Sequence, residues 1–334
     1  MSRLKTLATG TALVAALIGL SACGNTEGTK AADGAAATVS IQTNNGAMDV
    51  KTKPARIAAL DNTSFATLKA FGVQPVAVAK PLLPKDGYQD WASNADIKDA
   101  GSHREPKFEN ISEAQPDLII GGYRFASHTE KLSKIAPVVD IAPSDKDGAS
   151  YLDGLKKQTL ALGDILDKKE TAQKIVADLD SAIADAKKAT HGETVFLANS
   201  SGGTIDNGAG RIGTLLDGVN LKDVFAQDDG KLKSDSVHNN SGLSPETVAA
   251  AKPEWMIVMD RDAAVTEAGK EYKPAKSVIE GLGNVWKDTP FFAKNQIVHL
   301  PADFYLTEGI QAYTSVFKDI ATAFNGASSN GAAK

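Results

Sequence analysis

Short hydrophobic runs alternate with segments of helical periodicity along most of this chain. The runs have strand length and are rich in Val, Ile and Leu, so they predict buried strands, and the amphipathic segments predict covering helices. The first half has expected strands at residues 57–60, 73–79, 118–121 and 138–141 and helices at 63–71 and after Ser150. The second half has expected strands at residues 195–198, 256–259 and 297–300 and a helix at 212–217. This alternation indicates an α/β fold with two parallel sheets, each covered by helices on both faces.

One long helix is predicted between the two halves, at residues 167–190. Ile175, Leu179 and Ile183 recur at helical spacing along it. Asp167 with Glu170 resembles a capping box, and Lys187 and Lys188 stand at the end where the helix dipole favours cations. We expect this helix to connect two bodies, because the sequences before and after it repeat one another.

The repeat has the form of a glutamate, a proline and an arginine at equal spacings. In the first half these are Glu109, Pro116 and Arg124, with the hydrophobic run of residues 118–120 after the proline. In the second half they are Glu246, Pro253 and Arg261, with the hydrophobic run of residues 256–258. We therefore predict two similar Rossmann-like lobes, at residues 39–166 and 191–325, with the connecting helix between them.

The start of the chain has the features of a bacterial lipoprotein signal. Arg3 and Lys5 precede an apolar stretch that ends at Leu20, and Ser21, Ala22 and Cys23 follow. Cys23 is the only cysteine, so we expect a signal at residues 1–23 with diacylated (palmitate-bearing) Cys23 as the first mature residue. The alternative, an uncleaved membrane anchor, is disfavoured because the apolar stretch is short for a membrane span. Residues 24–38 are small and polar and predict a flexible tether, and residues 326–334 predict a disordered tail.

Composition and motifs disfavour several classes of protein, of which a surface α/β hydrolase is kept as a lesser alternative. With 36 basic and 41 acidic side chains, the chain has no field that would attract nucleic acid. A surface α/β hydrolase would need a nucleophile elbow, and no G-x-S-x-G sequence occurs. A zinc receptor would need clustered ligands, whereas the histidines are dispersed, at His103, His128, His191, His238 and His299.

Three arginines follow the predicted strands, where ligands of parallel sheets gather. Arg124 and Arg261 stand just past a strand in each half, and Arg211 lies in the glycine-rich loop after residues 195–198. Guanidinium groups stay charged at physiological pH and donate paired hydrogen bonds, so this cluster suits a strongly anionic ligand. His238 and Tyr305 stand in loops of the second half, and together could offer an imidazole nitrogen and a phenolate oxygen to iron.

Several segments together resemble the ferric-siderophore substrate-binding lipoproteins of Gram-positive and related bacteria, in the branch that takes catecholate siderophores. They are KPARIAALDNTSFATLKAFGV, GSHREPKFENISEAQPDLIIGGYR, DSVHNNSGLSPETVAAAKPEWMIVMDRDAAV and IVHLPADFYL. The resemblance implies a class III periplasmic-binding-protein fold, with two lobes, one rigid helix and a shallow cleft.

The resemblance also implies roles for the candidate residues. Basic side chains at Arg124, Arg211 and Arg261 would hold the catecholate oxygens, and His238 and Tyr305 would complete iron coordination when the siderophore supplies four donors. Glu109 and Glu246 match acidic residues that, in such proteins, dock into arginine pockets of the permease.

The expected protein is an extracytoplasmic, lipid-anchored receptor at the cell membrane. It would capture a ferric siderophore, deliver it to an ABC permease, act as a monomer without an intrinsic cofactor, and not be an enzyme. Receptors for haem, a corrinoid or a hydroxamate siderophore remain as alternatives, although three arginines suit more anionic oxygen than a neutral hydroxamate complex carries.

Overall fold

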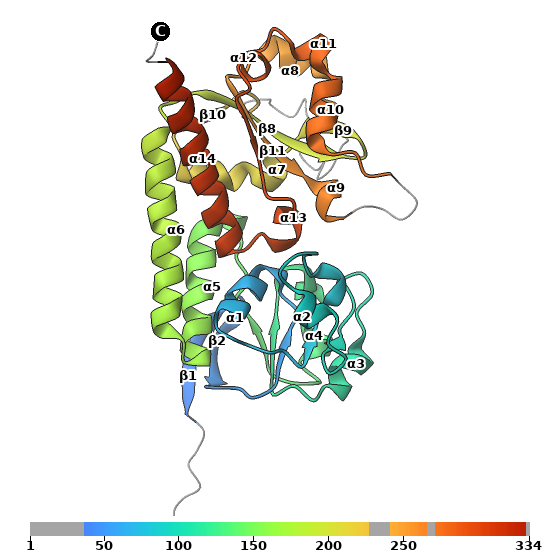
Figure 1. Cartoon of the computed structure of the whole chain (residues 1–334). Coiled ribbons are helices and arrows are strands. Elements are labelled where there is room, and N and C mark those ends of the chain that lie inside the picture. Colours follow the sequence, from blue (N-terminus) through green and yellow to red (C-terminus); the bar gives the residue numbers. More distant parts are fainter. Residues whose placement is uncertain (1–36, 227–240, 266–270, 332–334) are drawn as a thin grey trace, which may run out of the picture. The chain divides into compact units, whose positions relative to one another are not determined.

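The computed structural model describes residues 37–226, 241–265 and 271–331. These residues form two mainly parallel sheets and a group of long helices, which confirms the predicted α/β fold class (Figure 1). A separate two-stranded hairpin, β1 (Thr38–Thr43) with β2 (Gly46–Lys51), precedes the first sheet. In the described part of the chain, no helix has the length and apolar character that a membrane crossing requires.

The first sheet has the strand order β5-β4-β3-β6-β7, and all its pairings are parallel. Its strands are β3 (Ile57–Ala59), β4 (Ala77–Val78), β5 (Lys98–Asp99), β6 (Leu118–Gly121) and β7 (Val138–Asp140). Its helices are η1 (Asn62–Ser64), α1 (Phe65–Ala70), η2 (Lys80–Leu82), α2 (Gln89–Ala92), α3 (Phe108–Glu113), η3 (Tyr123–His128), α4 (Thr129–Leu132) and η4 (Lys146–Gly148). β4 is shorter than the strand expected at residues 73–79, because Pro75 has no N–H group to donate to a neighbouring strand.

The second sheet has the order β10-β8-β11-β12, and β9 pairs antiparallel with β8. Its strands are β8 (Thr194–Ser201), β9 (Thr204–Asn207), β10 (Lys222–Asp223), β11 (Trp255–Asp260) and β12 (Ile297–His299). Its helices are α7 (Ala209–Ile212), η5 (Gly213–Gly218), α8 (Pro245–Ala251), α9 (Arg261–Ala264), α10 (Ala275–Gly281), α11 (Gly283–Trp286), α12 (Pro290–Ala293) and α13 (Phe304–Thr307). The segment around Gly208 and Gly210 is therefore not the simple loop that we expected, because β9 returns along β8 before α7 begins.

The described part of the chain has three long helices. α5 (Tyr151–Leu166) and α6 (Lys169–Ala189) follow the first sheet in the sequence and precede the second, and α14 (Ile310–Gly331) follows the second sheet. α6 packs against both α5 and α14 and lies side by side with α14 in Figure 1. The connecting helix begins at Lys169, and the proposed capping box at Asp167 is wrong. Asp167 instead ends α5 in the left-handed conformation, with φ 55°, and its carboxylate pairs with Lys53 at 2.7 Å.

The predicted disordered tail is also wrong for residues 326–331, because α14 continues to Gly331. The helix packs against the second sheet, where the ring of Phe324 stacks on Trp255 of β11 with centroids 3.8 Å apart. Ala327 packs against the same core. These contacts stabilise the helix as far as Ala327.

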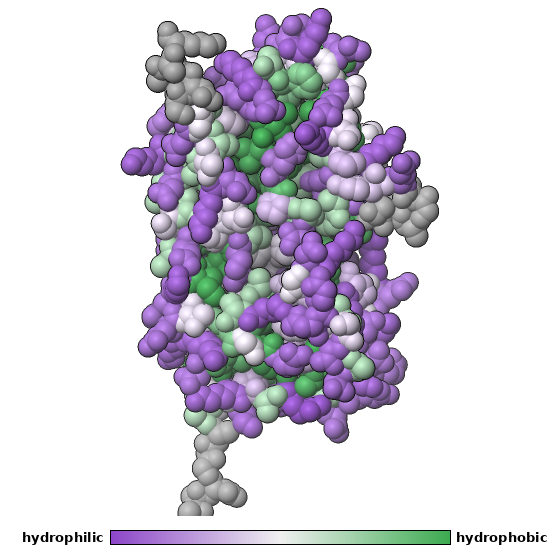
Figure 2. Space-filling view, viewed as in Figure 1, coloured by the Kyte–Doolittle hydropathy of each residue, from purple (hydrophilic) through white to green (hydrophobic). Residues whose placement is uncertain are grey.

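One continuous hydrophobic cluster runs from the first sheet through the long helices to one face of the second sheet. Alternate residues of β8 show the division: Val195 and Leu197 belong to this cluster, whereas Phe196 and Ala198 belong to a second cluster on the opposite face. Figure 2 shows hydrophilic residues over most of the visible face, with hydrophobic residues between them. Because the main cluster includes residues of both lobes, large relative movements of the lobes would disrupt buried contacts.

The sequence repeat corresponds to equivalent structural units. Glu109 and Glu246 lie in the first turns of α3 and α8, and Arg124 and Arg261 follow β6 and β11. In each unit a left-handed residue stands immediately before the repeated proline, Gln115 with φ 46° and Lys252 with φ 48°. The acidic residue after each proline then accepts a backbone N–H of the neighbouring segment: Asp117 from Ala55 and Arg56, Glu254 from Thr194.

Candidate anion-binding site

Arg124 is positioned by a tight turn at the end of β6. Gly122 has φ 95°, and a Cβ atom there would lie 2.2 Å from Oδ1 of Asp140, so only glycine fits. Tyr123 follows with φ 46° and begins η3, which carries Arg124. The Arg124 side chain is only 12% exposed.

Arg211 and Arg261 come from the second lobe. Gly208 brings α7 close to β8, because a Cβ atom there would lie 2.6 Å from the carbonyl carbon of Ala198. Arg261 opens α9 directly after β11 and its Nη1 atom lies 3.1 Å from Oδ1 of Asp262. Arg261 thus follows the end of a parallel strand, as the sequence predicted, whereas Arg211 lies on α7, after the antiparallel strand β9.

The three guanidinium groups converge on the ring of Tyr305, which lies in α13. Their central carbons lie 5.0 Å (Arg124), 5.0 Å (Arg211) and 5.4 Å (Arg261) from the ring centroid. Burial raises the pKa of the Tyr305 phenol, but the charges of Arg211 and Arg124 and hydrogen bonds from Arg261 and Arg124 lower that pKa overall. The Tyr305 phenol therefore ionises more readily in this site than a tyrosine does in water.

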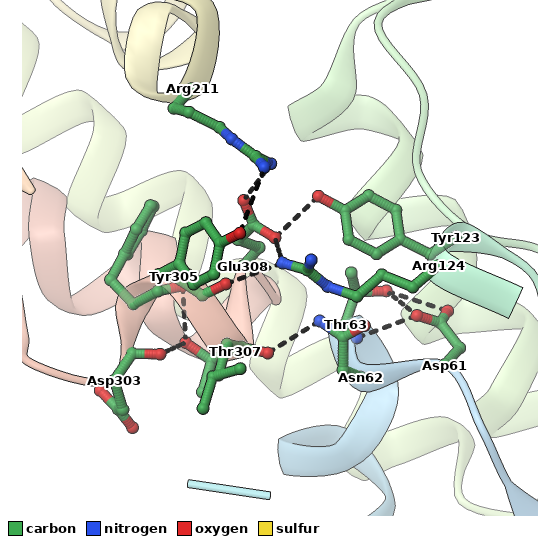
Figure 3. Close-up of polar contacts among 12 residues, drawn as sticks. Asp61, Asn62, Thr63, Tyr123, Arg124, Arg211, Asp303, Tyr305, Thr307 and Glu308 are labelled. Carbon is green, nitrogen blue, oxygen red and sulfur yellow. Dashed lines mark hydrogen bonds and ion pairs between the residues drawn. The ribbon is translucent and has the colours of Figure 1, made fainter. Parts of the chain in front are cut away.

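Glu308 is a site residue that the sequence did not reveal. Its carboxylate accepts a hydrogen bond from the Tyr123 hydroxyl at 2.8 Å and pairs with Arg124 at 3.0 Å and Arg211 at 3.6 Å (Figure 3). Its side chain is 5% exposed, so these charges interact with little screening. Glu308 has φ 42° at the end of α13, which turns the carboxylate toward the arginines.

The cluster keeps unused capacity for an anionic ligand. Its three arginines face two carboxylates, Glu308 and Asp262, so three positive charges minus two negative charges leave one in excess. In the described part of the chain, the buried Nε atom of each arginine also has no hydrogen-bond partner. Unsatisfied buried donors are uncommon in native proteins, so these Nε groups are available to bind an anion.

Contacts across the base of the cluster hold α13 against the first lobe. Nδ2 of Asn62 donates to the carbonyl oxygen of Leu306 at 2.7 Å, and a Cβ atom at Gly309 would lie 2.3 Å from the carbonyl oxygen of Thr63. The helix η1 that carries Asn62 is fixed by Asp61, which caps it and accepts from Gln158 at 2.7 Å. Tyr305 and Glu308 are thus held in place from both lobes.

Two cavities lie near these elements. One of about 460 Å³ borders Arg124, Arg211 and Glu308. A larger one of about 800 Å³ lies among β9, α8 and α10, and none of its lining residues is an arginine. Because the charged cluster borders the first cavity, this cavity rather than the larger, less charged one is the candidate anion site.

The structure does not place every predicted residue. His238 and Cys23 lie outside the described residues. Glu109 and Glu246 are exposed and separate from the arginine cluster, on α3 and α8. Among the residues that the structure describes, no group of three or more His, Cys, Asp or Glu side chains could hold a metal ion.

The periplasmic binding protein family model matches residues 57–304. This chain belongs to that family. The petrobactin-binding protein YclQ of Bacillus subtilis is 28% identical over 321 residues, covering 92% of this chain and 95% of its own length. The ferric-anguibactin-binding protein FatB of Vibrio anguillarum is 26% identical over 288 residues, covering 84% and 85%.

Solved structures show the same fold. The catecholate-siderophore-binding protein VctP of Vibrio cholerae matches with a TM-score of 0.73 at 23% identity, over 86% of this chain and all of that chain. The predicted class III periplasmic-binding-protein fold is therefore confirmed.

Proposed function

We propose that this protein captures an iron(III)-siderophore complex, of catecholate type, and delivers it to an ABC permease for iron uptake. The observation that carries the proposal is the convergence of three guanidinium groups on one tyrosine ring at the strand ends. A ferric catecholate presents several anionic oxygens around a metal that accepts phenolate, and the cluster matches both properties. The relatives YclQ and FatB are named for binding petrobactin and ferric anguibactin.

Recognition would use both lobes. Arg124, Arg211 and Arg261 would donate hydrogen bonds to catecholate oxygens, and Tyr305 would coordinate iron when the siderophore supplies only four donors. His238 is the proposed second iron ligand. Because the site is held by buried contacts before the ligand arrives, little ordering entropy would be lost on binding.

The test uses two ferric catecholates that differ in the number of donors. We expect a tetradentate complex to show an altered ligand-to-metal charge-transfer band on addition of the protein, because the Tyr305 phenolate enters the iron coordination sphere. Binding through phenolate releases the phenol proton, so affinity for this complex should rise with pH until the Tyr305 pKa is passed.

The variants Tyr305→Phe and His238→Ala should weaken the tetradentate complex far more than a hexadentate one, and Tyr305→Phe should abolish the spectral change. A ferric hydroxamate without net charge serves as control and should bind more weakly to the wild type. Tighter binding of the hydroxamate than of either catecholate would overturn the proposed ligand class.

We also propose that the protein is anchored to the extracytoplasmic side of the cell membrane through lipid on Cys23. Cys23→Ala should release the protein or leave an unprocessed precursor, because the sequence contains no other thiol for attachment. Incorporation of labelled palmitate into the variant would contradict this anchor.

A further inference from the structure

The cavity beside the arginine cluster is also lined by aromatic and acidic residues. They include Tyr123, Tyr151, Tyr313, Asp140 and Asp145. Tyr123 also contacts the anion site, because its hydroxyl donates to Glu308 and its ring centroid lies 5.6 Å from the guanidinium carbon of Arg124. These rings and acids suit a cation rather than an anion.

Asp140 is the central feature of this part of the cavity. It is the last residue of β7 and is 6% exposed. Its Oδ1 atom accepts hydrogen bonds from Nδ2 of Asn44 at 2.8 Å and from the backbone N–H of Ala142 at 3.3 Å. Neither donor is a cation, and no lysine, arginine or histidine among the described residues forms an ion pair with Asp140. A buried carboxylate without a cationic partner is costly, and a positive group of a ligand would offset that cost.

Two of the three tyrosines use their hydroxyl groups on Glu308. Tyr123 donates to the Glu308 carboxylate, and Tyr151 donates to the Glu308 carbonyl oxygen at 2.9 Å. Tyr151 and Tyr313 pack with ring centroids 5.6 Å apart and planes tilted by 45°. Burial is the largest cause that raises the pKa of each of these phenols, so all three remain neutral. Neutral rings around a carboxylate form a favourable environment for an ammonium group.

The positive charges of the same cavity are matched in number by its acids: Arg124, Arg211 and Lys146 face Glu308, Asp140 and Asp145. Arg124 and Arg211 pair with Glu308, whose carboxylate lies between the two guanidinium groups (Figure 3). Lys146 lines the cavity but is exposed to solvent.

We propose that this pocket, defined by Asp140, Tyr123, Tyr151 and Tyr313, binds an alkylammonium group of the ligand while the arginine cluster binds its catecholate oxygens. The proposal rests on the proposed function and narrows the substrate to ferric catecholates that carry a cationic amine arm. Alkylamines are protonated at neutral pH, so the arm would supply the cationic partner that Asp140 lacks.

The test compares two ferric complexes that differ only at the end of one arm. Both are built from 2,3-dihydroxybenzamide, one with a 4-aminobutyl arm and one with a pentyl arm of the same length, and binding is followed by fluorescence quenching at neutral pH. A charge-assisted hydrogen bond to a largely buried carboxylate predicts tighter binding of the aminobutyl complex, on the order of tenfold, to the wild type.

Asp140→Asn should bring the ratio of the two affinities close to one. The matched control is Asp223→Asn, because Asp223 also ends an edge strand and accepts a backbone N–H two residues later, from Phe225, yet does not line this cavity. It should keep the wild-type ratio. Thermal melts of both variants check folding, and the wild-type comparison does not depend on either variant.

Equal affinity of the wild type for the two complexes would overturn the ammonium pocket and leave the proposed function intact. Persistence of the preference in Asp140→Asn would also overturn it. If the wild type binds neither complex nor any other ferric catecholate, the proposed function fails, and this pocket fails with it.

Discussion

Arg124→Ala is expected to weaken binding of a ferric catecholate by about 1.5 to 3 kcal/mol, because the variant loses charge-assisted hydrogen bonds to the ligand. It should also lower the free energy of unfolding by about 1 to 3 kcal/mol, because the Glu308 carboxylate, 5% exposed, loses the nearer of its two cationic partners and keeps Arg211 at 3.6 Å. Ligand titration by fluorescence quenching and urea unfolding measure the two losses separately.

A double variant separates the two effects of Arg124. Adding Glu308→Gln to Arg124→Ala removes the carboxylate that has lost its nearer partner, so it should restore part of the stability without restoring ligand affinity. Arg261→Ala provides a comparison, since its partner Asp262 is 16% exposed, against 5% for Glu308, and also accepts from the backbone N–H of Gly202. Unchanged stability of Arg124→Ala would contradict the structural importance that we assign to the Arg124–Glu308 pair.

Glu109→Arg combined with Glu246→Arg is expected to abolish iron uptake in cells while the affinity for the ferric siderophore stays unchanged in solution. We propose that both carboxylates dock into basic pockets of the permease, where reversing two charges replaces attraction with repulsion. Both side chains are exposed, lie at equivalent positions of the two repeats and are not part of the arginine cluster.

The control carries the same charge change elsewhere on each lobe. Glu130→Arg with Glu280→Arg reverses two exposed side chains, 91% and 62% accessible, on α4 and α10. This control should leave uptake near the wild-type level. Loss of uptake in both double variants would attribute the effect to net charge, and loss of ligand affinity in the Glu109 and Glu246 variant would contradict the docking assignment.

The sequence predicted the parts of the fold that have strong periodicity. β6 lies at the expected residues, and β8, β11 and β12 overlap their predicted ranges, because buried parallel strands are continuous hydrophobic runs. It missed the short strands β5 and β10, which consist of a lysine followed by an aspartate, Lys98–Asp99 and Lys222–Asp223. Such edge strands have neither length nor hydrophobicity, and only the sheet beside them gives them their conformation.

The candidate site likewise contains residues that the sequence predicted and one that it did not. The arginines and Tyr305 could be found because they stand at strand ends in a recognisable order. Glu308 could not, since its contact with Arg124 joins residues 184 positions apart and depends on a left-handed turn at a non-glycine residue. The signal available was only an acidic residue before Gly309, and many turns share that pattern.

Glu308 also affects which anions the ligand-free protein would bind. Chloride, phosphate and free carboxylates are abundant outside the cell, and a bare cluster of arginines would bind them. With a carboxylate already within 3.0 Å of Arg124 and 3.6 Å of Arg211, a small anion meets repulsion as well as attraction. A bulky complex that carries several negative charges can engage all three arginines and the Tyr305 ring at once, whereas a small anion cannot. The protein would thereby select its cargo by valence and size from a medium rich in competing salts.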